Sequence, residues 1–171
     1  LNTSADETAV CNLGSINYPN HIRNGAFDQE MVKRTVTTAM RMLDNVLQDF
    51  IDRAPDEMAR AKYSASRERS VGLGVMGYHS FLQSRGVGFE SALAKSWNMK
   101  FFKHIRAQVD EASMMLANER GACPDAADQG VMERFSCKMA IAPTASISII
   151  CGGTSACIEP IPANIYTHKT L

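Results

Sequence analysis

Two long stretches with helical spacing of apolar residues constrain the fold of this chain more than any other feature of its sequence. In the first, from Asp28 to about Asp52, apolar residues recur at steps of three and four, and Asp28 suits the capping of a first turn. The second runs from about Glu90 to Glu119 with the same spacing, and Gly121 follows where a helix would end. We therefore expect two long helices, each with one buried face. These faces consist of Val32, Val36, Ala39, Met40, Leu43, Leu47, Phe50 and Ile51 in the first helix and of Leu93, Trp97, Phe101, Ile105, Val109, Ala112 and Leu116 in the second.

The segments around these helices predict shorter elements. A charged connector is expected from Pro55 to Arg69, and a short apolar helix from Val75 to Gln83, ended by two nearby glycines. Lys138–Ala142 resembles a short buried strand that Pro143 interrupts, and residues 146–151 are β-branched and apolar. Helices followed by strand-like runs favour an α/β fold class.

The composition fits one globular domain or part of a larger one. Lys and Arg number 18, as do Asp and Glu, so the chain lacks the basic surplus of proteins that neutralise nucleic-acid phosphates. A small anion held by backbone amides remains an open alternative. The balanced charge therefore argues against a nucleic acid as a partner. No apolar stretch is long enough to cross a bilayer, so a membrane is not an expected partner either, and a cytoplasmic location is expected.

The chain ends and the cysteines support two further expectations. Neither end carries the signals of a natural terminus, so residues 1–171 are expected to be a partial domain truncated at both ends.

The chain has five cysteines, an odd number, without a Cys-x-x-Cys pair, and its four histidines are scattered. This spacing is wrong for a zinc site, so no metal ligands are expected, and a reducing compartment is favoured over a disulfide scaffold.

Gly72, Gly74 and Gly77 match the G-x-G-x-x-G pattern of dinucleotide-binding turns. That pattern binds a dinucleotide only between a strand and a helix, with an acidic residue about twenty positions later. Here the preceding residues 64–70 are polar, residues 95–97 offer no carboxylate, and a long helix is expected where a second strand is needed. We therefore favour close backbone packing at the start of a helix, and an NAD-type oxidoreductase is the weaker alternative.

Two other segments could carry chemistry. Residues 142–148, Ala-Pro-Thr-Ala-Ser-Ile-Ser, could present successive N–H groups to a phosphate, although an ordinary strand-to-turn transition explains the same composition. Cys11 lies between apolar residues, and a lone cysteine in such a setting is usually a small buried side chain. Spacing alone does not assign either segment a function.

Five segments, taken in their order along the chain, closely resemble the large catalytic subunit of ribonucleotide reductases. They span nearly the whole sequence, and they are residues 9–17, 69–77, 120–124, 140–148 and 158–160. The resemblance implies a ten-stranded α/β barrel, of which residues 1–171 would form a partial catalytic barrel domain. It also implies the reduction of ribonucleoside diphosphates to 2′-deoxyribonucleotides by thiyl-radical chemistry, for DNA precursor synthesis, in an allosteric, ATP-binding enzyme.

The resemblance also implies roles for single residues. Cys11 would be one of two redox-active cysteines that reduce the ribose, and Leu13 would lie near the substrate. The substrate phosphates would be held by a cradle consisting of Pro143, Thr144, Ala145, Ser146 and Ile147. Cys137 stands where members of the family usually carry a polar residue such as Asn. The family's radical cysteine, in an Asn-x-Cys-x-Glu motif, is absent from these 171 residues, so the isolated chain is expected to be inactive.

The partners follow from the same resemblance. No cofactor is expected on this segment itself. The radical would come from a metal-containing small subunit or, alternatively, from adenosylcobalamin, and thioredoxin or glutaredoxin would restore the reducing cysteines. The chain would also contact the rest of its large subunit, which would form a homodimer. A different hypothesis is that the chain is a split or relic fragment that has no activity and only docks to a complementary chain.

Overall fold

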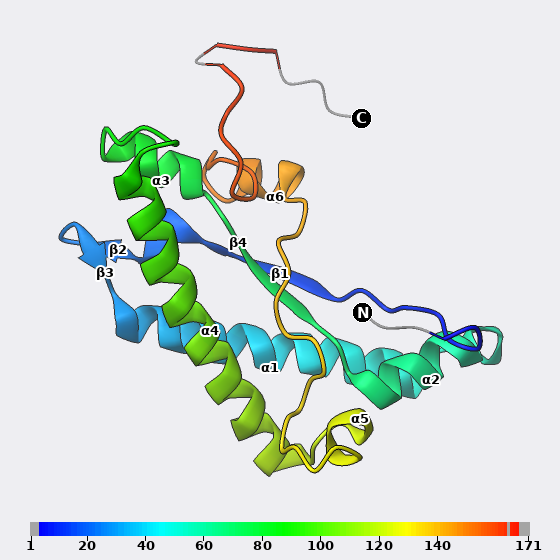
Figure 1. Ribbon diagram of the computed structural model, residues 1–171. Coiled ribbons are helices and arrows are strands. Elements are labelled where there is room, and N and C mark those ends of the chain that lie inside the picture. Colours follow the sequence, from blue (N-terminus) through cyan, green and yellow to red (C-terminus); the bar gives the residue numbers. More distant parts are fainter. Residues whose placement is uncertain (1–3, 164, 168–171) are drawn as a thin grey trace.

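The computed structural model describes residues 4–163 and 165–167, and two long helices dominate it (Figure 1). Helix α1 spans Gln29–Arg53 and helix α4 spans Ala92–Arg120, and the two pack against each other. The Asp28 carboxylate accepts a hydrogen bond from the Met31 N–H at 2.9 Å, and Ser91 caps α4 in the same way through Ala94. Both predicted helices are therefore confirmed, together with the Asp28 cap.

The buried faces of these helices also follow the predicted spacing, with one exception at an end. Val32, Val36 and Met40 of α1 are fully buried, as are Phe101 and Ile105 of α4. The remaining positions of the two stripes are buried or half-buried except for Leu93, which is 54% exposed. The prediction that Leu93 is buried was wrong, because in the first turn of α4 the neighbouring Ala94, seven residues before Phe101, faces the core instead and is 2% exposed.

A parallel pair of strands lies across the two helices. Strand β1, Leu13–Asn17, pairs with β4, Gly72–Met76, in a register that runs from Leu13 opposite Gly72 to Asn17 opposite Met76. Leu73 of β4 also forms a single parallel bridge to Met139 on its other side. The chain between β1 and β4 contains α1 and a shorter helix, α2, and so provides the long crossover connection that two parallel strands need. A small hairpin of β2, Ile22–Arg23, and β3, Ala26–Phe27, precedes α1.

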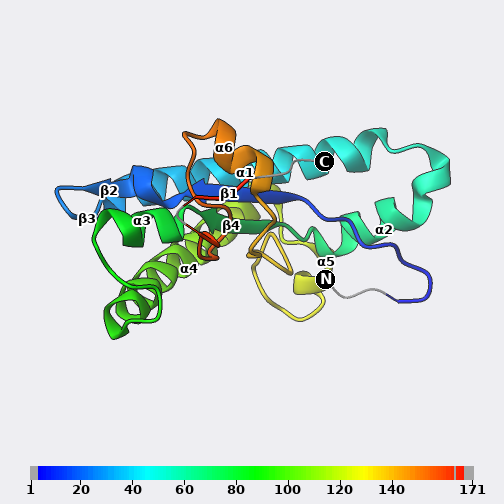
Figure 2. The ribbon, with the colours of Figure 1, turned by 90° about the horizontal axis from the view of Figure 1, so that it is seen from above.

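Short helices complete the fold. They are the 3₁₀ turns η1, Tyr18–His21, and η2, Asp56–Met58, and the α-helices α2, Ala59–Glu68, α3, Tyr78–Ser84, α5, Pro124–Ala127, and α6, Ala145–Ile150. Figure 2, seen from above, places α6 over the strands. No helix in the described part of the chain is long and apolar enough to cross a membrane.

The structure corrects three predictions about the shorter elements. The predicted charged connector is largely helical. The prediction missed helix α2 because its buried face consists of small or polar side chains, such as Ala61 and Ala65, which give little hydrophobic signal in the sequence. The start of the predicted helix at Val75 belongs to β4, and the helix begins only at Tyr78. Residues 146–151 are not a strand, since most of them lie in α6 with Ile147, Ile149 and Ile150 exposed.

The predicted strand Lys138–Ala142 is confirmed only as an extended segment. It makes one bridge, at Met139, and two hydrogen bonds to Leu73, whose N–H donates to the Lys138 carbonyl and whose carbonyl accepts from Ala140. Ala140 and Ile141 are exposed in the structure, although burial was expected. One flank of this segment therefore has no covering layer among the described residues.

A buried carboxylate connects three parts of the fold. Asp44 of α1 is completely inaccessible to solvent, and its Oδ1 accepts hydrogen bonds from Arg69 at 2.7 Å and Arg134 at 2.9 Å. Its Oδ2 accepts from Arg120 at the end of α4 at 2.7 Å. Burial alone would raise the pKa of Asp44, but the hydrogen bonds from Arg134 and Arg69 outweigh it and hold this pKa below its usual range.

Candidate functional site

Helix α6 begins where the extended segment 138–143 ends, and its first turn leaves backbone donors available. The first N–H groups of any helix have no carbonyl partner within that helix, and the N-cap residue Thr144 makes no side-chain cap hydrogen bond. The Thr144 hydroxyl oxygen instead accepts a hydrogen bond from the Cys157 N–H at 2.6 Å, and the Cys157 thiol donates to the Ala142 carbonyl at 3.0 Å. Thr144 is therefore buried as an anchor, while residues 145–147 are exposed.

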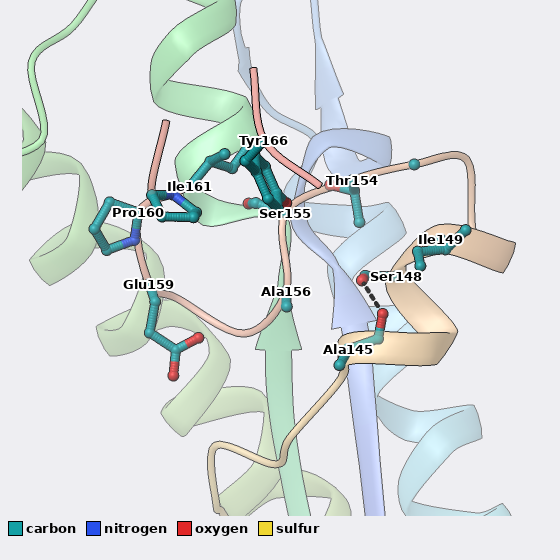
Figure 3. A pocket seen from close by; sticks show the side chains of 12 residues that line it. Ala145, Ser148, Ile149, Thr154, Ser155, Ala156, Glu159, Pro160, Ile161 and Tyr166 are labelled. Atoms are coloured by element: carbon teal, nitrogen blue, oxygen red, sulfur yellow. Dashed lines mark hydrogen bonds between the residues drawn. The ribbon is translucent and has the colours of Figure 1, made fainter. Parts of the chain in front are cut away.

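A cavity of about 380 Å³ lies between α6 and the loop that follows it. In Figure 3, Ser148 and Ile149 of α6 lie on one side of it, and Glu159, Pro160 and Ile161 lie on the other. The Ser148 hydroxyl is turned back onto its own helix, where it donates to the Ala145 carbonyl at 3.1 Å. Ala145 is the member of the predicted cradle that lines this cavity; the lining residues are Ala145, Ser148, Ile149, Gly153, Thr154, Ser155, Ala156, Glu159, Pro160, Ile161, Pro162 and Tyr166.

The loop after α6 is attached to the start of α3 by four hydrogen bonds. Ser80 and Ser155 exchange two of them, since each backbone N–H donates to the other residue's hydroxyl, at 3.0 and 2.8 Å. The Gly77 N–H donates to the Ser155 carbonyl at 2.8 Å, and the Ile161 N–H donates to Nδ1 of His79 at 2.9 Å. Sequence analysis did not identify this attachment, because no local pattern connects residues about 75 to 82 positions apart.

Cys11 lies at the other end of the extended segment. It is exposed and lines a cavity of about 150 Å³ whose walls include Leu13, Gly72, Cys137 and Ala140. The default expectation for a lone cysteine, burial, is therefore wrong for Cys11. Leu13, at the start of β1, is 40% exposed.

The three glycines of the G-x-G-x-x-G match serve close packing. A Cβ atom at Gly74 would come within 2.1 Å of the Ala140 carbonyl oxygen, and one at Gly72 would meet Leu13 and Ala140. Gly77 has a φ of +85° and stands at the N-cap of α3. Close packing was predicted at a helix start, but most of it occurs within β4, against Ala140 and Ile141 of the neighbouring extended segment.

The sequence model described as the ribonucleotide reductase barrel domain matches residues 1–131 and 126–171, which together span the chain. The chain belongs to this ribonucleotide reductase family. The fold expected from the resemblance, a helix-rich part of the reductase barrel domain, is thereby confirmed.

Individual members of the reductase family agree with this assignment. The large subunit of ribonucleoside-diphosphate reductase from Invertebrate iridescent virus 6 is 42% identical over all of this chain, which covers 17% of that protein. The vitamin B12-dependent ribonucleoside-diphosphate reductase of Thermoplasma acidophilum is 35% identical over 94% of the chain and 21% of its own length. The solved class Id ribonucleotide reductase alpha subunit of Actinobacillus ureae superposes with a TM-score of 0.85 at 33% identity, covering 96% of this chain and 30% of that one. The chain thus spans less than a third of the length of each of these reductases.

Within this reductase segment, the structure groups the predicted site residues into two places. Pro143, Thr144 and residues 145–147 lie together at the start of α6, whereas Cys11 and Leu13 lie at the start of β1. Segment 137–143 joins them, because it borders the Cys11 cavity at one end and leads into α6 at the other. Among residues 4–163 and 165–167, no cluster of three or more His, Cys, Asp or Glu side chains could hold a metal ion.

Proposed function

We propose that the large subunit containing this chain reduces ribonucleoside diphosphates to 2′-deoxyribonucleotides, with Cys11 as one of its two reducing cysteines. The observation that carries the proposal is the exposed thiol of Cys11 in a cavity that it shares with Leu13 and Ala140. Four residue steps, at most roughly 13 Å of extended chain, lead from Ala140 to Thr144 at the start of α6. A nucleotide could therefore present its ribose to Cys11 while its phosphates reach the first turn of α6.

In this mechanism the cradle, residues 143–147, holds the diphosphate by backbone N–H groups. These donors need no lysine or arginine to bind an anion. Pro143 fixes the entry of the chain into α6, and the anchored Thr144 keeps the first turn in place through Cys157. Leu13 packs beside the ribose and limits the access of water to it.

Cys11 supplies reducing equivalents in this mechanism. Its thiol and a second cysteine thiol lose two protons and two electrons as their sulfur atoms form a disulfide. The substrate gains those two electrons and two protons: one proton leaves with the 2′-hydroxyl as water, and the other becomes the second hydrogen at C2′. Thioredoxin or glutaredoxin then reduces the disulfide by thiol exchange, which requires direct sulfur contact and hence an accessible Cys11.

The radical that starts the reaction comes from outside this segment in our proposal. We place the radical source in a metal-containing small subunit, with adenosylcobalamin as the alternative, because the resemblance to ribonucleotide reductase large subunits implies one of these two sources. The Thermoplasma acidophilum relative is named as vitamin B12-dependent, which supports keeping adenosylcobalamin as the alternative. The remaining partners are the rest of the large subunit and a second copy of it.

Replacement of Cys11 by serine in the complete large subunit tests the redox assignment. We expect Cys11→Ser to abolish multiple turnover of a ribonucleoside diphosphate with a dithiol reductant, because serine cannot form the disulfide. Cys151→Ser is the matched control, since Cys151 is also exposed but lies outside the Cys11 cavity. Sustained turnover by Cys11→Ser would show that another residue is the reductant.

A second candidate function is docking without chemistry, and one surface favours it. Met42 and Val46 of α1 are 62% and 58% exposed, and they border a groove of about 410 Å³ beside β1. Exposed apolar surface of this kind marks a missing partner, which we take to be the remainder of the large subunit. Gel filtration of the chain with and without that remainder tests this, and Val46→Lys should weaken any complex. A catalytically active complex would favour the first proposal over a purely structural role.

A further inference from the structure

The first half of helix α4 carries a run of positive charge that the helix itself does not need. Residues 91–109 contain four basic residues and no acidic one, in a chain whose Lys and Arg equal its Asp and Glu in number. Lys95 lies near the start of α4, where the helix dipole favours acidic side chains instead. Lys100 and Lys103 have no acidic residue three or four positions away that could pair with them along the helix. Helix stability therefore does not explain these lysines.

Lys100 and Lys103 are exposed, and neither forms an ion pair or a hydrogen bond with any residue in the described part of the chain. The second half of α4 differs in this respect, since Glu111 there pairs with Lys33 of α1 at 2.7 Å. Two neighbouring amines without a counter-charge leave a positive potential over this part of the helix. A ligand or partner for this surface should therefore be acidic.

The two lysines border a groove of about 570 Å³ between α4 and the hairpin of β2 and β3, which lies beside the first half of α4 in Figure 1. Phe27 and Trp97 give the groove an aromatic lining, and their half-buried rings pack edge-on with centroids 5.7 Å apart. Cations and aromatic rings thus occur together there without a carboxylate. The residues that line the groove are Ala26, Phe27, Gln29, Trp97, Lys100, Lys103, His104 and Ala107.

We propose that this groove binds an acidic segment of the remainder of the same large subunit. Carboxylates of the segment pair with Lys100 and Lys103, and one large apolar or aromatic side chain packs against Phe27 and Trp97. The positive potential selects the sign of the segment's charge, and the aromatic lining selects its apolar side chain. This inference does not depend on the reduction chemistry proposed above.

The size of the groove points to a segment of the same subunit rather than to a separate protein. Eight residues line it, whereas a stable interface between separate proteins has about 20–30 residues on each side. A tethered segment needs fewer contacts, because its effective concentration at the groove is on the order of mM. The chain spans at most 30% of each of the reductases compared above, so those proteins have ample sequence outside the matched part to supply such a segment.

Carbodiimide cross-linking of the complete large subunit tests the partner, because this reagent joins a lysine amine directly to a carboxylate in contact with it. An equal mixture of ordinary and isotope-labelled subunits, assembled together, separates links within one subunit from links between two copies. We expect Lys100 or Lys103 to be joined to an Asp or Glu outside residues 1–171, and only within one isotope class. Acetylation is the second readout: Lys100 and Lys103 should react about fivefold more slowly than Lys95, which is exposed on the same helix but does not line the groove.

Three variants of the complete subunit separate the charge, the groove and the rest of the helix. Lys100→Gln combined with Lys103→Gln should accelerate amide hydrogen exchange in the cross-linked segment about fivefold, because each exposed ion pair contributes little. Ala107→Leu fills the groove without altering its charge and should accelerate that exchange about tenfold. Lys95→Gln is the matched control and should stay within about twofold of the unmodified protein.

The alternative occupants give different results, and each of these results overturns the inference. Links between isotope classes would place a second copy in the groove. Acetylation of Lys100 and Lys103 at the rate of Lys95 would mean that the groove is open, and slow acetylation without a link would mean that a surface without carboxylates covers it. A link to a residue within 1–171 would show that the chain itself supplies the counter-charge. Unchanged exchange in the lysine double variant or in Ala107→Leu would show that the linked segment does not bind through the charges or the groove.

Discussion

Replacing Asp44 by asparagine should lower the free energy of unfolding of this chain by about 4 kcal/mol at neutral pH, because removal of one partner from a buried ion pair leaves charge uncompensated. The Asp44 carboxylate is fully buried and accepts hydrogen bonds from Arg69, Arg134 and Arg120. The side chains of Arg69 and Arg134 are each only 7% exposed, so neither guanidinium can regain water without movement of the chain. Asparagine has nearly the same shape, so the loss reports charge rather than a cavity.

A loss of this size would be a large fraction of the 5–15 kcal/mol that stabilises a typical domain. Urea unfolding of both proteins, followed by circular dichroism, measures it directly. Asp49→Asn is the matched control on the same helix. Its carboxylate pairs with Arg53, but the two side chains are 58% and 80% exposed, and exposed pairs contribute little.

The pH dependence of the difference provides a second, independent check. The pKa of Asp44 is lowered in the folded chain, so its ionised form stabilises the fold above the unfolded pKa of about 4. That stabilisation is lost as the pH falls through the lower folded pKa, when the carboxylate becomes protonated. The gap between the unmodified chain and Asp44→Asn should therefore narrow below about pH 4. Equal unfolding midpoints at pH 7, or a gap that widens in acid, would refute the reasoning.

Three smaller perturbations follow from the same structure and can be measured by the same unfolding assay. Gly74→Ala should cost about 3 kcal/mol, because its new methyl group collides with a backbone carbonyl, whereas Gly88→Ala, with no atom within 4 Å, should cost almost nothing. Thr144→Val should cost about 2 kcal/mol by leaving the buried Cys157 N–H without an acceptor, and Thr144→Ser should restore most of it. Asp28→Ala should cost about 1 kcal/mol through loss of the α1 cap, and an effect below experimental error would contradict that assignment.

The long helices were predictable because their signals are local. Apolar residues three and four positions apart lie on one helical face whatever the rest of the chain does, and the Asp28 cap acts within a single turn. Short elements lack this redundancy. Residues 145–150 are rich in isoleucine and serine and would suit a strand, yet they form α6, where Thr144 is tied to Cys157 and Ser148 bonds back to Ala145.

The candidate site also combines residues that could be predicted from the sequence with contacts that could not. The cysteine and the cradle residues were identified from short contiguous motifs, and their assignment to the reductase family follows from the sequence comparison. Their function remains a prediction. The loop attachment at His79 and Ser80 could not be predicted, because both residues look like ordinary polar residues of a short helix.

By itself, the sequence determined the two long helices and the cap of α1, since each depends on residues that are close together along the chain. It also determined the membership in the reductase family, through a match that spans the chain. Only the tertiary structure decided that Gly72–Met76 is a strand, that Cys11 is exposed, and that Asp44 meets Arg134 from 90 positions away. The physical reason is the range of the interactions. Helical periodicity and capping act within a few residues, whereas strand pairing, burial and the compensation of a buried charge depend on which distant segments the folded chain brings into contact.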